Sequence, residues 1–138
     1  MKEIEIYIDG ASKGNPGPSG IGLIICQQGR VIKNIATYIG KTTNNIAEYT
    51  AFIYALEEAL ILKAEYLKVN TDSQLLAQQI NKVYKVKSPG IINLYNQATH
   101  LLSAFKKVNV NYISRENNRG ADKLANKAIK EAPGKIAF

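Results

Sequence analysis

The sequence of 138 residues contains no tryptophan, a single histidine and a single cysteine, Cys26. One cysteine cannot form an internal disulfide, so the disulfide-stapled secreted scaffolds are excluded and a reducing, cytoplasmic setting is expected. One cysteine and one histidine also make a structural zinc site an unfavoured interpretation. No stretch approaches the roughly 20 consecutive apolar residues that a membrane-spanning helix requires. We therefore expect no membrane association.

The composition is that of an ordinary globular domain. Hydrophobic residues make up 46% of the chain, which is too many for a disordered protein. The length predicts one domain over residues 1–138, and we expect it to be a monomer. The 18 Lys and Arg residues outnumber the 11 Asp and Glu residues, which gives a formal net charge of +7. That excess favours an anionic partner such as nucleic acid.

Hydrophobic periodicity predicts alternating strands and helices. Residues 3–9 alternate isoleucine with polar residues, as a strand does, and turn-forming residues crowd a loop expected over 10–20. Gly17, Gly20 and Gly22, at the end of that region and just after it, lack the spacing of a dinucleotide-binding loop and are predicted as a turn. Further strands are expected at 20–27, 30–39, 67–71 and 108–112. Helices are expected to begin near Asn44, Ser73, Pro89 and Asn118.

This order of elements predicts an α/β fold. Three consecutive strands joined by short connections favour antiparallel pairing, and strands separated by helices favour parallel pairing. We expect a five-stranded mixed sheet, antiparallel over its first three strands and then parallel, with helices on both faces.

Four carboxylates fall at positions that such a fold brings to one edge of the sheet. Asp9 and Asp72 end two strands, and Glu48 and Asp122 lie in the first turns of two helices. Strand carboxyl ends and helix amino ends share the edge where α/β proteins bind ligands. Packed like charges repel, and Mg²⁺, which prefers carboxylate oxygens, would offset that repulsion. Two such ions ~4 Å apart can clamp the attacking and leaving oxygens of a phosphodiester, so the acids indicate a metal-dependent nuclease.

Each acid taken alone also has a structural interpretation. An Asp at a strand end is often a turn former or a helix cap, which suits Asp72 before Ser73. Acids in a first helical turn suit the helix dipole, which covers Glu48 and Asp122. These interpretations leave unexplained why Glu48 interrupts an apolar helix start and why Asp9 leads into a glycine-rich loop.

Four segments that contain these acids resemble ribonuclease HI, the type 1 ribonuclease H. They occur in the family's order and extend over nearly the whole chain: Tyr7-Ile-Asp-Gly-Ala-Ser-Lys-Gly-Asn-Pro-Gly17, Thr43-Asn-Asn-Ile-Ala-Glu48, Thr71-Asp-Ser-Gln74 and Asn118-Arg-Gly-Ala-Asp-Lys-Leu-Ala125. Each segment alone is a weak signal, and the four in order, each with its acid, are a strong one.

The resemblance implies an endonuclease that hydrolyses the RNA strand of an RNA–DNA hybrid. The positions matching Asp9, Glu48, Asp72 and Asp122 bind two Mg²⁺ or Mn²⁺ ions in this family. One ion activates water for attack on phosphorus and the other stabilises the departing 3′ oxygen, which leaves 5′-phosphate and 3′-hydroxyl ends.

The resemblance also implies a substrate groove. The matching residues are Gly10, Ser12, Asn15, Thr43, Asn44 and Asn45. Most of them line the groove that senses RNA 2′-hydroxyls, while Thr43 matches a position that contacts a DNA phosphate. This agrees with the physical requirement, because the 2′-hydroxyl distinguishes RNA from DNA and glycine permits close backbone approach.

Two features depart from many family members. The stretch Tyr112-Ile-Ser-Arg-Glu-Asn-Asn118 is short and lacks the loop histidine, and Arg115 or Glu116 could occupy its place, as in the short-loop branch. The basic, tryptophan-rich protrusion is missing, and only Lys82, Lys85 and Lys87 remain in that region. A weaker, more salt-sensitive affinity for the hybrid is therefore expected.

These departures keep other functions open. One is a non-catalytic or weakly active nucleic-acid-binding domain on the same fold, and a second is a relative of resolvases or transposases. Double-stranded RNA stays open as a further substrate. The complete set of four acids favours the enzyme, since unneutralised acids would repel phosphate in a pure binding module.

Overall fold

The computed structural model describes residues 2–132, which form one sheet with helices packed against it. The elements, in chain order, are β1 (Glu3–Ser12), β2 (Gly17–Gln27), β3 (Arg30–Thr42), α1 (Asn44–Ile61), β4 (Tyr66–Thr71), α2 (Gln74–Ile80), α3 (Pro89–Leu102), β5 (Lys107–Tyr112), the short 3₁₀ helix η1 (Arg115–Asn118) and α4 (Arg119–Lys130). This is the predicted order, with a 3₁₀ turn added before the last helix.

The five strands form a mixed sheet in the order β3-β2-β1-β4-β5. β1 pairs antiparallel with β2 and parallel with β4, and it lies at the centre of the sheet. β2 pairs antiparallel with β3, and β4 pairs parallel with β5. The predicted sheet, antiparallel and then parallel, is therefore confirmed.

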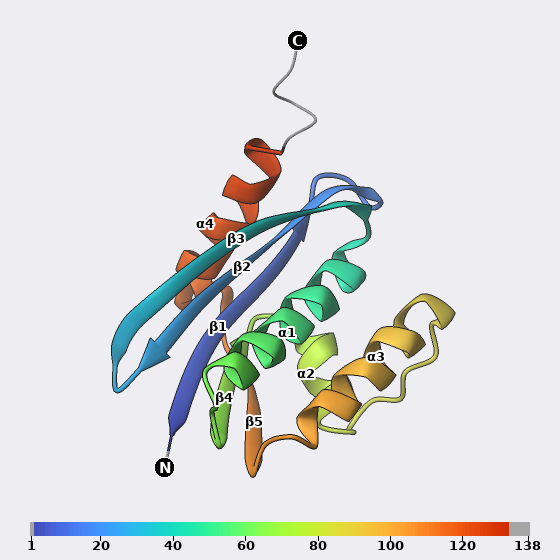
Figure 1. Ribbon diagram of the computed structural model, residues 1–138. Coiled ribbons are helices and arrows are strands. Elements are labelled where there is room, and N and C mark those ends of the chain that lie inside the picture. The colour runs from blue at the N-terminus through green and yellow to red at the C-terminus, as the bar shows by residue number, and fades with distance from the viewer. Residues whose placement is uncertain (1, 133–138) are drawn as a thin grey trace.

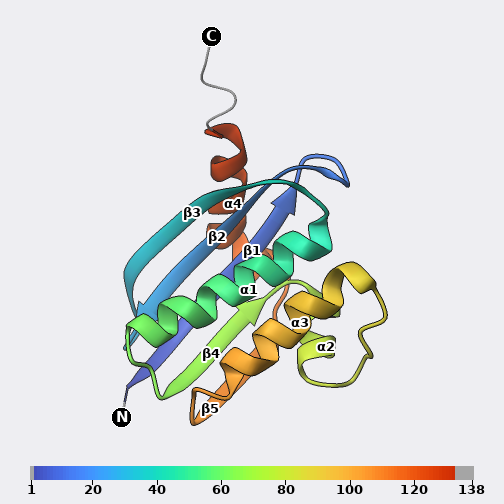
Figure 2. The same cartoon turned by 45° about the vertical axis from the view of Figure 1, so that its right-hand side comes forward.

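Helices cover both faces of this sheet, as predicted. α1 crosses one face over β1 and packs against α3, while α4 lies on the opposite face over β1, β2 and β3 (Figure 1). The rotated view shows α1, α2 and α3 together on the near side and α4 behind the sheet (Figure 2). Ile4, Ile6 and Ile8 of β1 belong to the buried core, together with Tyr49, Phe52 and Leu56 of α1.

The predicted loop over residues 10–20 is wrong in its extent. β1 continues to Ser12 and β2 already begins at Gly17, so Gly17, Gly20 and Gly22 lie in a strand rather than in a turn. Positions 20 and 22 are glycine because α4 packs closely on them. A Cβ on Gly20 would lie 2.6 Å from the Ala125 carbonyl oxygen, and one on Gly22 would lie 2.2 Å from that of Ala121. The glycines let the backbone of α4 approach β2 closely.

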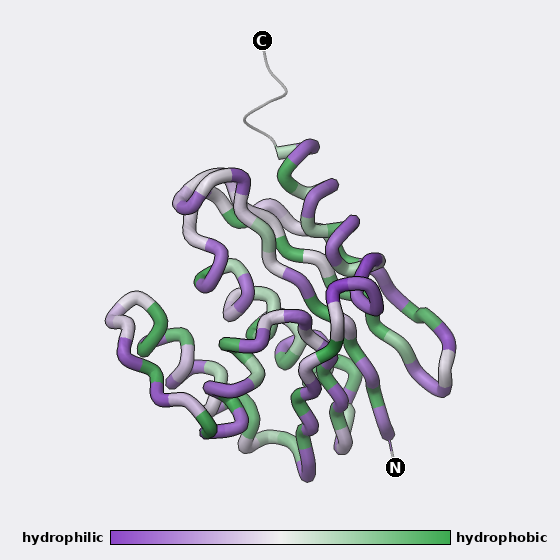
Figure 3. The backbone as a smooth tube through the Cα atoms, turned by 180° about the vertical axis from the view of Figure 1, so that it is seen from behind, coloured by the Kyte–Doolittle hydropathy of each residue, from purple (hydrophilic) through white to green (hydrophobic). Residues whose placement is uncertain are grey.

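α4 is strongly amphipathic. Its buried residues are Ala121, Ala125, Ala128 and Ile129. Hydrophilic and hydrophobic residues alternate along this helix in the view from behind (Figure 3). Small alanines on the inner face match the glycines of β2, so the helix carrying Asp122 is held close to the strand next to β1. Within residues 2–132, no helix is long and apolar enough to cross a membrane.

Candidate active site

Three carboxylates from three separate elements meet at one point. Asp9 lies on β1, Glu48 in the second turn of α1, and Asp72 directly after β4. One oxygen of each lies within 4.8 Å of the others. Asp9 is only 5% exposed, whereas Glu48 and Asp72 are intermediate in exposure. The topology that places parallel β1 and β4 side by side therefore brings together residues far apart in the sequence.

Glu48 is held by the backbone of β1. The Gly10 N–H donates a hydrogen bond of 2.7 Å to Glu48 Oε1. A Cβ at position 10 would lie 2.3 Å from the Ala47 carbonyl carbon, so only glycine allows α1 to begin this close to β1. The start of α1 is in turn fixed by its N-cap residue Thr43, whose Oγ1 accepts a hydrogen bond of 3.3 Å from the Ile46 N–H.

Asp122 lies beside this trio rather than within its tightest group. It is in the first turn of α4 and lines the same cavity, of about 280 Å³, as Asp9, Glu48 and Asp72. Its charge contributes to raising the pKa of both Asp9 and Glu48. The four acids predicted to converge therefore do share one cavity, with Asp122 at its α4 side.

The pKa values of two acids in the cluster, Asp9 and Glu48, are strongly raised. Burial, followed by the negative charges of Glu48, Asp72 and Asp122, raises the pKa of Asp9 to about 9. Burial also raises the pKa of Glu48 to about 8, although the Gly10 N–H and the Arg115 charge act in the opposite direction. Without a bound cation, these two carboxyl groups are therefore largely protonated at neutral pH.

The donor set fits a hard divalent cation. Oxygen ligands from several carboxylates are the ligands that Mg²⁺ and Mn²⁺ take in proteins. Asp72 Oδ2 is buried and has no hydrogen-bond partner among residues 2–132. A buried carboxylate oxygen without a partner is costly, and a cation between the three acids would satisfy it.

Three of the six residues expected to line a substrate groove line this cavity, and the other three lie beside them along the chain. Gly10, Ser12 and Asn44 line it directly. The Asn44 N–H donates a hydrogen bond of 3.0 Å to Asn15 Oδ1, which ties the β1–β2 connection to the start of α1. Thr43 and Asn45 flank Asn44 at this helix start without lining the cavity.

The two candidates for the place of the missing histidine differ in position. Arg115, at the start of η1, lines the cavity and lowers the pKa of Glu48. Glu116 is exposed and is not among the residues that line the cavity. The structure therefore brings Arg115, but not Glu116, to the acids.

Lys13 and Asn126 also line the cavity, although sequence reasoning did not single them out. Asn126 Nδ2 donates hydrogen bonds to the Asp122 carbonyl oxygen at 2.9 Å and to Asp122 Oδ1 at 3.2 Å. Its spacing of four residues from Asp122 on a predicted helix was a signal that could have identified it. Lys13 carried no comparable signal, since it lies in a turn-rich stretch.

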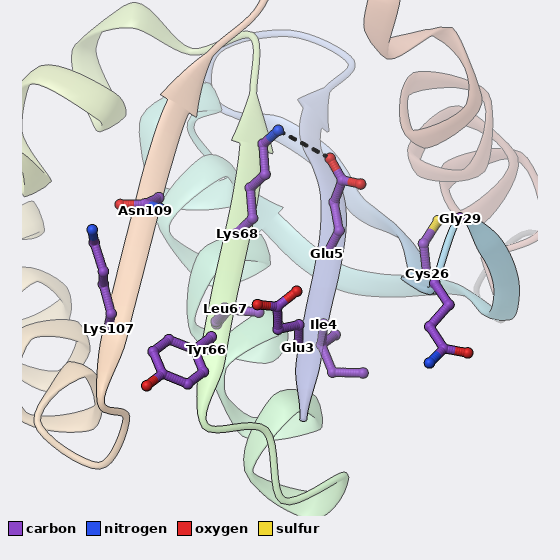
Figure 4. Close-up of a pocket in the computed structure, with 11 residues that line it drawn as sticks. Glu3, Ile4, Glu5, Cys26, Gly29, Tyr66, Leu67, Lys68, Lys107 and Asn109 are labelled. Atoms are coloured by element: carbon purple, nitrogen blue, oxygen red, sulfur yellow. Dashed lines mark ion pairs between the residues drawn. The ribbon is translucent and has the colours of Figure 1, made fainter. Parts of the chain in front are cut away.

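A larger cavity, of about 530 Å³, lies at the opposite end of the strands (Figure 4). Its charged lining is mixed in sign and partly self-neutralised: Lys68 Nζ lies 3.6 Å from Glu5 Oε2. It opens near the amino ends of β1, β4 and β5, away from the edge where the acids meet. The acid cavity is therefore the candidate active site.

The chain is similar in sequence and structure to several known proteins. The profile of a family described as "Reverse transcriptase-like" matches residues 7–128. A ribonuclease HI of Halobacterium salinarum is 35% identical over 130 residues, which cover 94% of this chain and 65% of that protein. A ribonuclease H of Shewanella denitrificans is 30% identical over 149 residues, which cover 98% of this chain and 92% of that protein.

A bifunctional protein of Mycobacterium tuberculosis is 39% identical over 132 residues, and the chain spans only 36% of its length. The solved N-terminal RNase H domain from that organism superimposes with a TM-score of 0.93 at 37% identity, covering 99% of this chain and 100% of that one. LC11-RNase H1, solved in complex with an RNA/DNA hybrid, gives a TM-score of 0.88 at 39% identity, covering 94% and 98% of the two chains.

Proposed function

The chain belongs to the type 1 ribonuclease H family, and on this premise we propose that it is an endoribonuclease that hydrolyses the RNA strand of RNA–DNA hybrids. The observation that carries the proposal is the convergence of Asp9, Glu48 and Asp72 within 4.8 Å. Three carboxylates packed this closely repel one another and destabilise the metal-free fold, so their convergence is best explained by the binding of cations.

Asp9, Glu48, Asp72 and Asp122 would hold the divalent cations of the reaction, two Mg²⁺ or Mn²⁺ ions in our proposal. Such cations, when bound, lower the pKa of water and stabilise charge on phosphate oxygens. The carboxyl groups of Asp9 and Glu48 would give up their protons when cations bind, and the four acids would fix the position of those cations at the edge of the sheet. We propose in-line attack of water on phosphorus, with 5′-phosphate and 3′-hydroxyl products.

The rim of the cavity would bind the hybrid. Ser12, Asn15 and Asn44 offer short polar side chains and backbone groups that would contact RNA 2′-hydroxyls, with Gly10 permitting close approach. Asn45 would contact RNA 2′-hydroxyls as well, and Thr43 would contact a phosphate of the DNA strand. LC11-RNase H1, a relative with the same fold, was solved with an RNA/DNA hybrid, which supports this class of substrate.

Arg115 is proposed as an auxiliary residue in place of the family's loop histidine, since it lines the cavity with the acids. We give Glu116 a lesser role, through the position of η1 only. We also propose that residues 1–138 act as one ribonuclease H-like domain, that the chain is a monomer and that it works in the cytoplasm.

A cleavage assay with 5′-labelled RNA in an RNA–DNA hybrid tests the function, with Mg²⁺ and Mn²⁺ supplied separately. Single-stranded RNA, double-stranded RNA and duplex DNA serve as substrate controls. The wild type should cut the hybrid only when metal is present, and Asp72→Asn should reduce cutting by several orders of magnitude while the fold is retained. Glu65→Gln is the matched control, because Glu65 pairs with Lys106 at 2.9 Å far from the cavity, and it should cut normally.

A folded wild type that binds the hybrid without cutting it, with either metal, would overturn the proposal. That result would favour the non-catalytic binding domain, the alternative suggested by the missing histidine and protrusion. Equal cutting by wild type and Asp72→Asn would instead refute the assignment of the site.

A further inference from the structure

A buried asparagine, Asn118, links the two elements that carry Asp9 and Asp122. Asn118 is 2% exposed and lies at the junction of η1 and α4, four residues before Asp122. Its Nδ2 donates a hydrogen bond of 2.8 Å to the carbonyl oxygen of Ile8, which directly precedes Asp9. One side chain therefore joins the strand that carries Asp9 to the helix that carries Asp122.

Because Asn118 makes this contact with β1, its side chain does not cap α4. Asn118 is the N-cap residue of α4, and asparagine is among the best N-cap residues because its side-chain oxygen accepts a hydrogen bond from the first helical turn. Within residues 2–132, however, Asn118 makes no capping hydrogen bond, and its buried Oδ1 has no partner. The side chain bonds to the backbone of β1 rather than to the first turn of α4.

The contact between Asn118 and Ile8 lies where the pairing of β1 with β4 ends. Ile8 is the last residue of β1 in register with β4, opposite Thr71, so the next residue, Asp9, extends past the end of that ladder. Asn118 therefore binds the backbone of β1 at the point where strand pairing to β4 stops.

We infer that Asn118 is a positioning residue for the metal ligands, whose amide holds the β1 backbone at Asp9 and the first turn of α4 at a fixed separation. The inference rests on the function proposed above. Removing the amide should let Asp9 and Asp122 move apart, which weakens cation binding and leaves the rim that binds the hybrid unchanged. Partners behind metal ligands typically contribute about 10–100-fold in metal affinity.

The test compares Asn118→Ala and the milder Asn118→Ser, whose hydroxyl is too short to span the gap, with two controls. Asn81→Ala removes a chemically similar bond, since Asn81 Nδ2 donates to the Val110 carbonyl oxygen at 3.1 Å on the far side of the sheet from α4. Val110→Ala truncates a buried core residue and controls for lost stability.

Mn²⁺ binding is measured by calorimetry without substrate, and the Mg²⁺ concentration for half-maximal cleavage is measured at saturating hybrid. Both Asn118 variants should need roughly ten-fold more metal, with the KM for the hybrid at saturating metal within about two-fold of the wild type. The two controls should keep wild-type metal affinity.

Wild-type metal affinity in a folded Asn118 variant, or an equal loss in either control, would overturn the inference. A wild type that binds no divalent cation would overturn the proposed function itself, so the two failures are distinguishable. If neither variant folds, ¹⁵N-labelled wild type decides: the Asn118 side-chain amide signals should shift on Mg²⁺ titration while those of Asn81 stay. An unmoved Asn118 signal would count against the inference.

Discussion

The backbone N–H of Gly10 donates a 2.7 Å hydrogen bond to Glu48 Oε1 across the contact between β1 and α1. The bond is possible because position 10 has no Cβ, which would lie 2.4 Å from the Ala47 carbonyl oxygen. Gly10 therefore sets the distance between the strand that carries Asp9 and the helix that carries Glu48. The site depends on this glycine as much as on its acids.

Gly10→Ala should damage both activity and stability. The new Cβ meets backbone atoms of Ala47 and Glu48, which cannot rotate away, so the start of α1 must shift and the bond to Glu48 is lost. We expect unfolding in urea to show a loss of roughly 1–3 kcal/mol. The kcat for hybrid cleavage should fall by about 100-fold, as a misplacement near 1 Å can cause.

Gly90→Ala is the matched control for that substitution. Position 90 lies in the first turn of α3, and the nearest atoms to an added Cβ are at 3.8 Å or more, which is ordinary contact. Alanine favours a helix over glycine by up to about 1 kcal/mol, so this variant should be as stable as the wild type or more so, with unchanged kcat. Similar losses in both variants would show that the close approach at Gly10 is not special.

Local sequence patterns predicted the order and type of the elements, because strand and helix periodicities are set by neighbouring residues. They failed where distant segments decide the outcome. Gly20 and Gly22 were interpreted as part of a turn although they fall in the strand expected over 20–27, and they are glycine because α4, about a hundred residues later in the chain, packs on them. The four acids were predictable from their places at strand ends and helix starts. Asn118 was predicted only as a helix start, since its bond to Ile8 links residues 110 positions apart.

The metal-free protein should lose stability as the pH rises. The pKa of Asp9 is raised from 3.8 to about 9 and that of Glu48 from 4.5 to about 8. The folded chain therefore keeps these protons at pH values where the unfolded chain has lost them. The free energy of unfolding must then fall as the pH rises from about 4 through 8 to 9.

Asp9→Asn removes the larger of these two effects and should raise the Tm of the metal-free protein at pH 8 by several degrees. The gain should shrink toward pH 4, because the carboxyl group of the unfolded chain begins to take up its proton as the pH approaches 3.8. Thermal unfolding in a chelating buffer across pH 4–9 measures it. If the Asp9→Asn variant were less stable than the wild type at pH 8, the loss of stability at high pH could not be assigned to the raised pKa of Asp9.

Cation binding should release protons. At pH 7 the carboxyl groups of Asp9 and Glu48 are protonated to a large extent, and a divalent cation requires their ionised forms. Apparent Mn²⁺ affinity should therefore rise with pH up to about 9. Calorimetry at pH 7 in buffers of different ionisation enthalpy should give heats that differ in proportion to those enthalpies, corresponding to at least one proton released. Heats that are independent of the buffer would mean that both acids are already ionised.

The connection between Asn15 and Asn44 should control binding of the hybrid rather than the chemical step. Asn15 Oδ1 accepts a 3.0 Å hydrogen bond from the Asn44 N–H, so it holds the β1–β2 connection against the start of α1 at the rim of the cavity. Asn15→Ala leaves the acids in place but frees both segments. One hydrogen bond contributes about 1 kcal/mol, so the KM for the hybrid should rise by roughly five- to ten-fold with kcat within two-fold. Asn34→Ala, at an exposed position on β3 remote from this rim, should leave both constants unchanged. A drop in kcat with an unchanged KM would instead place Asn15 in the machinery that orients the scissile phosphate.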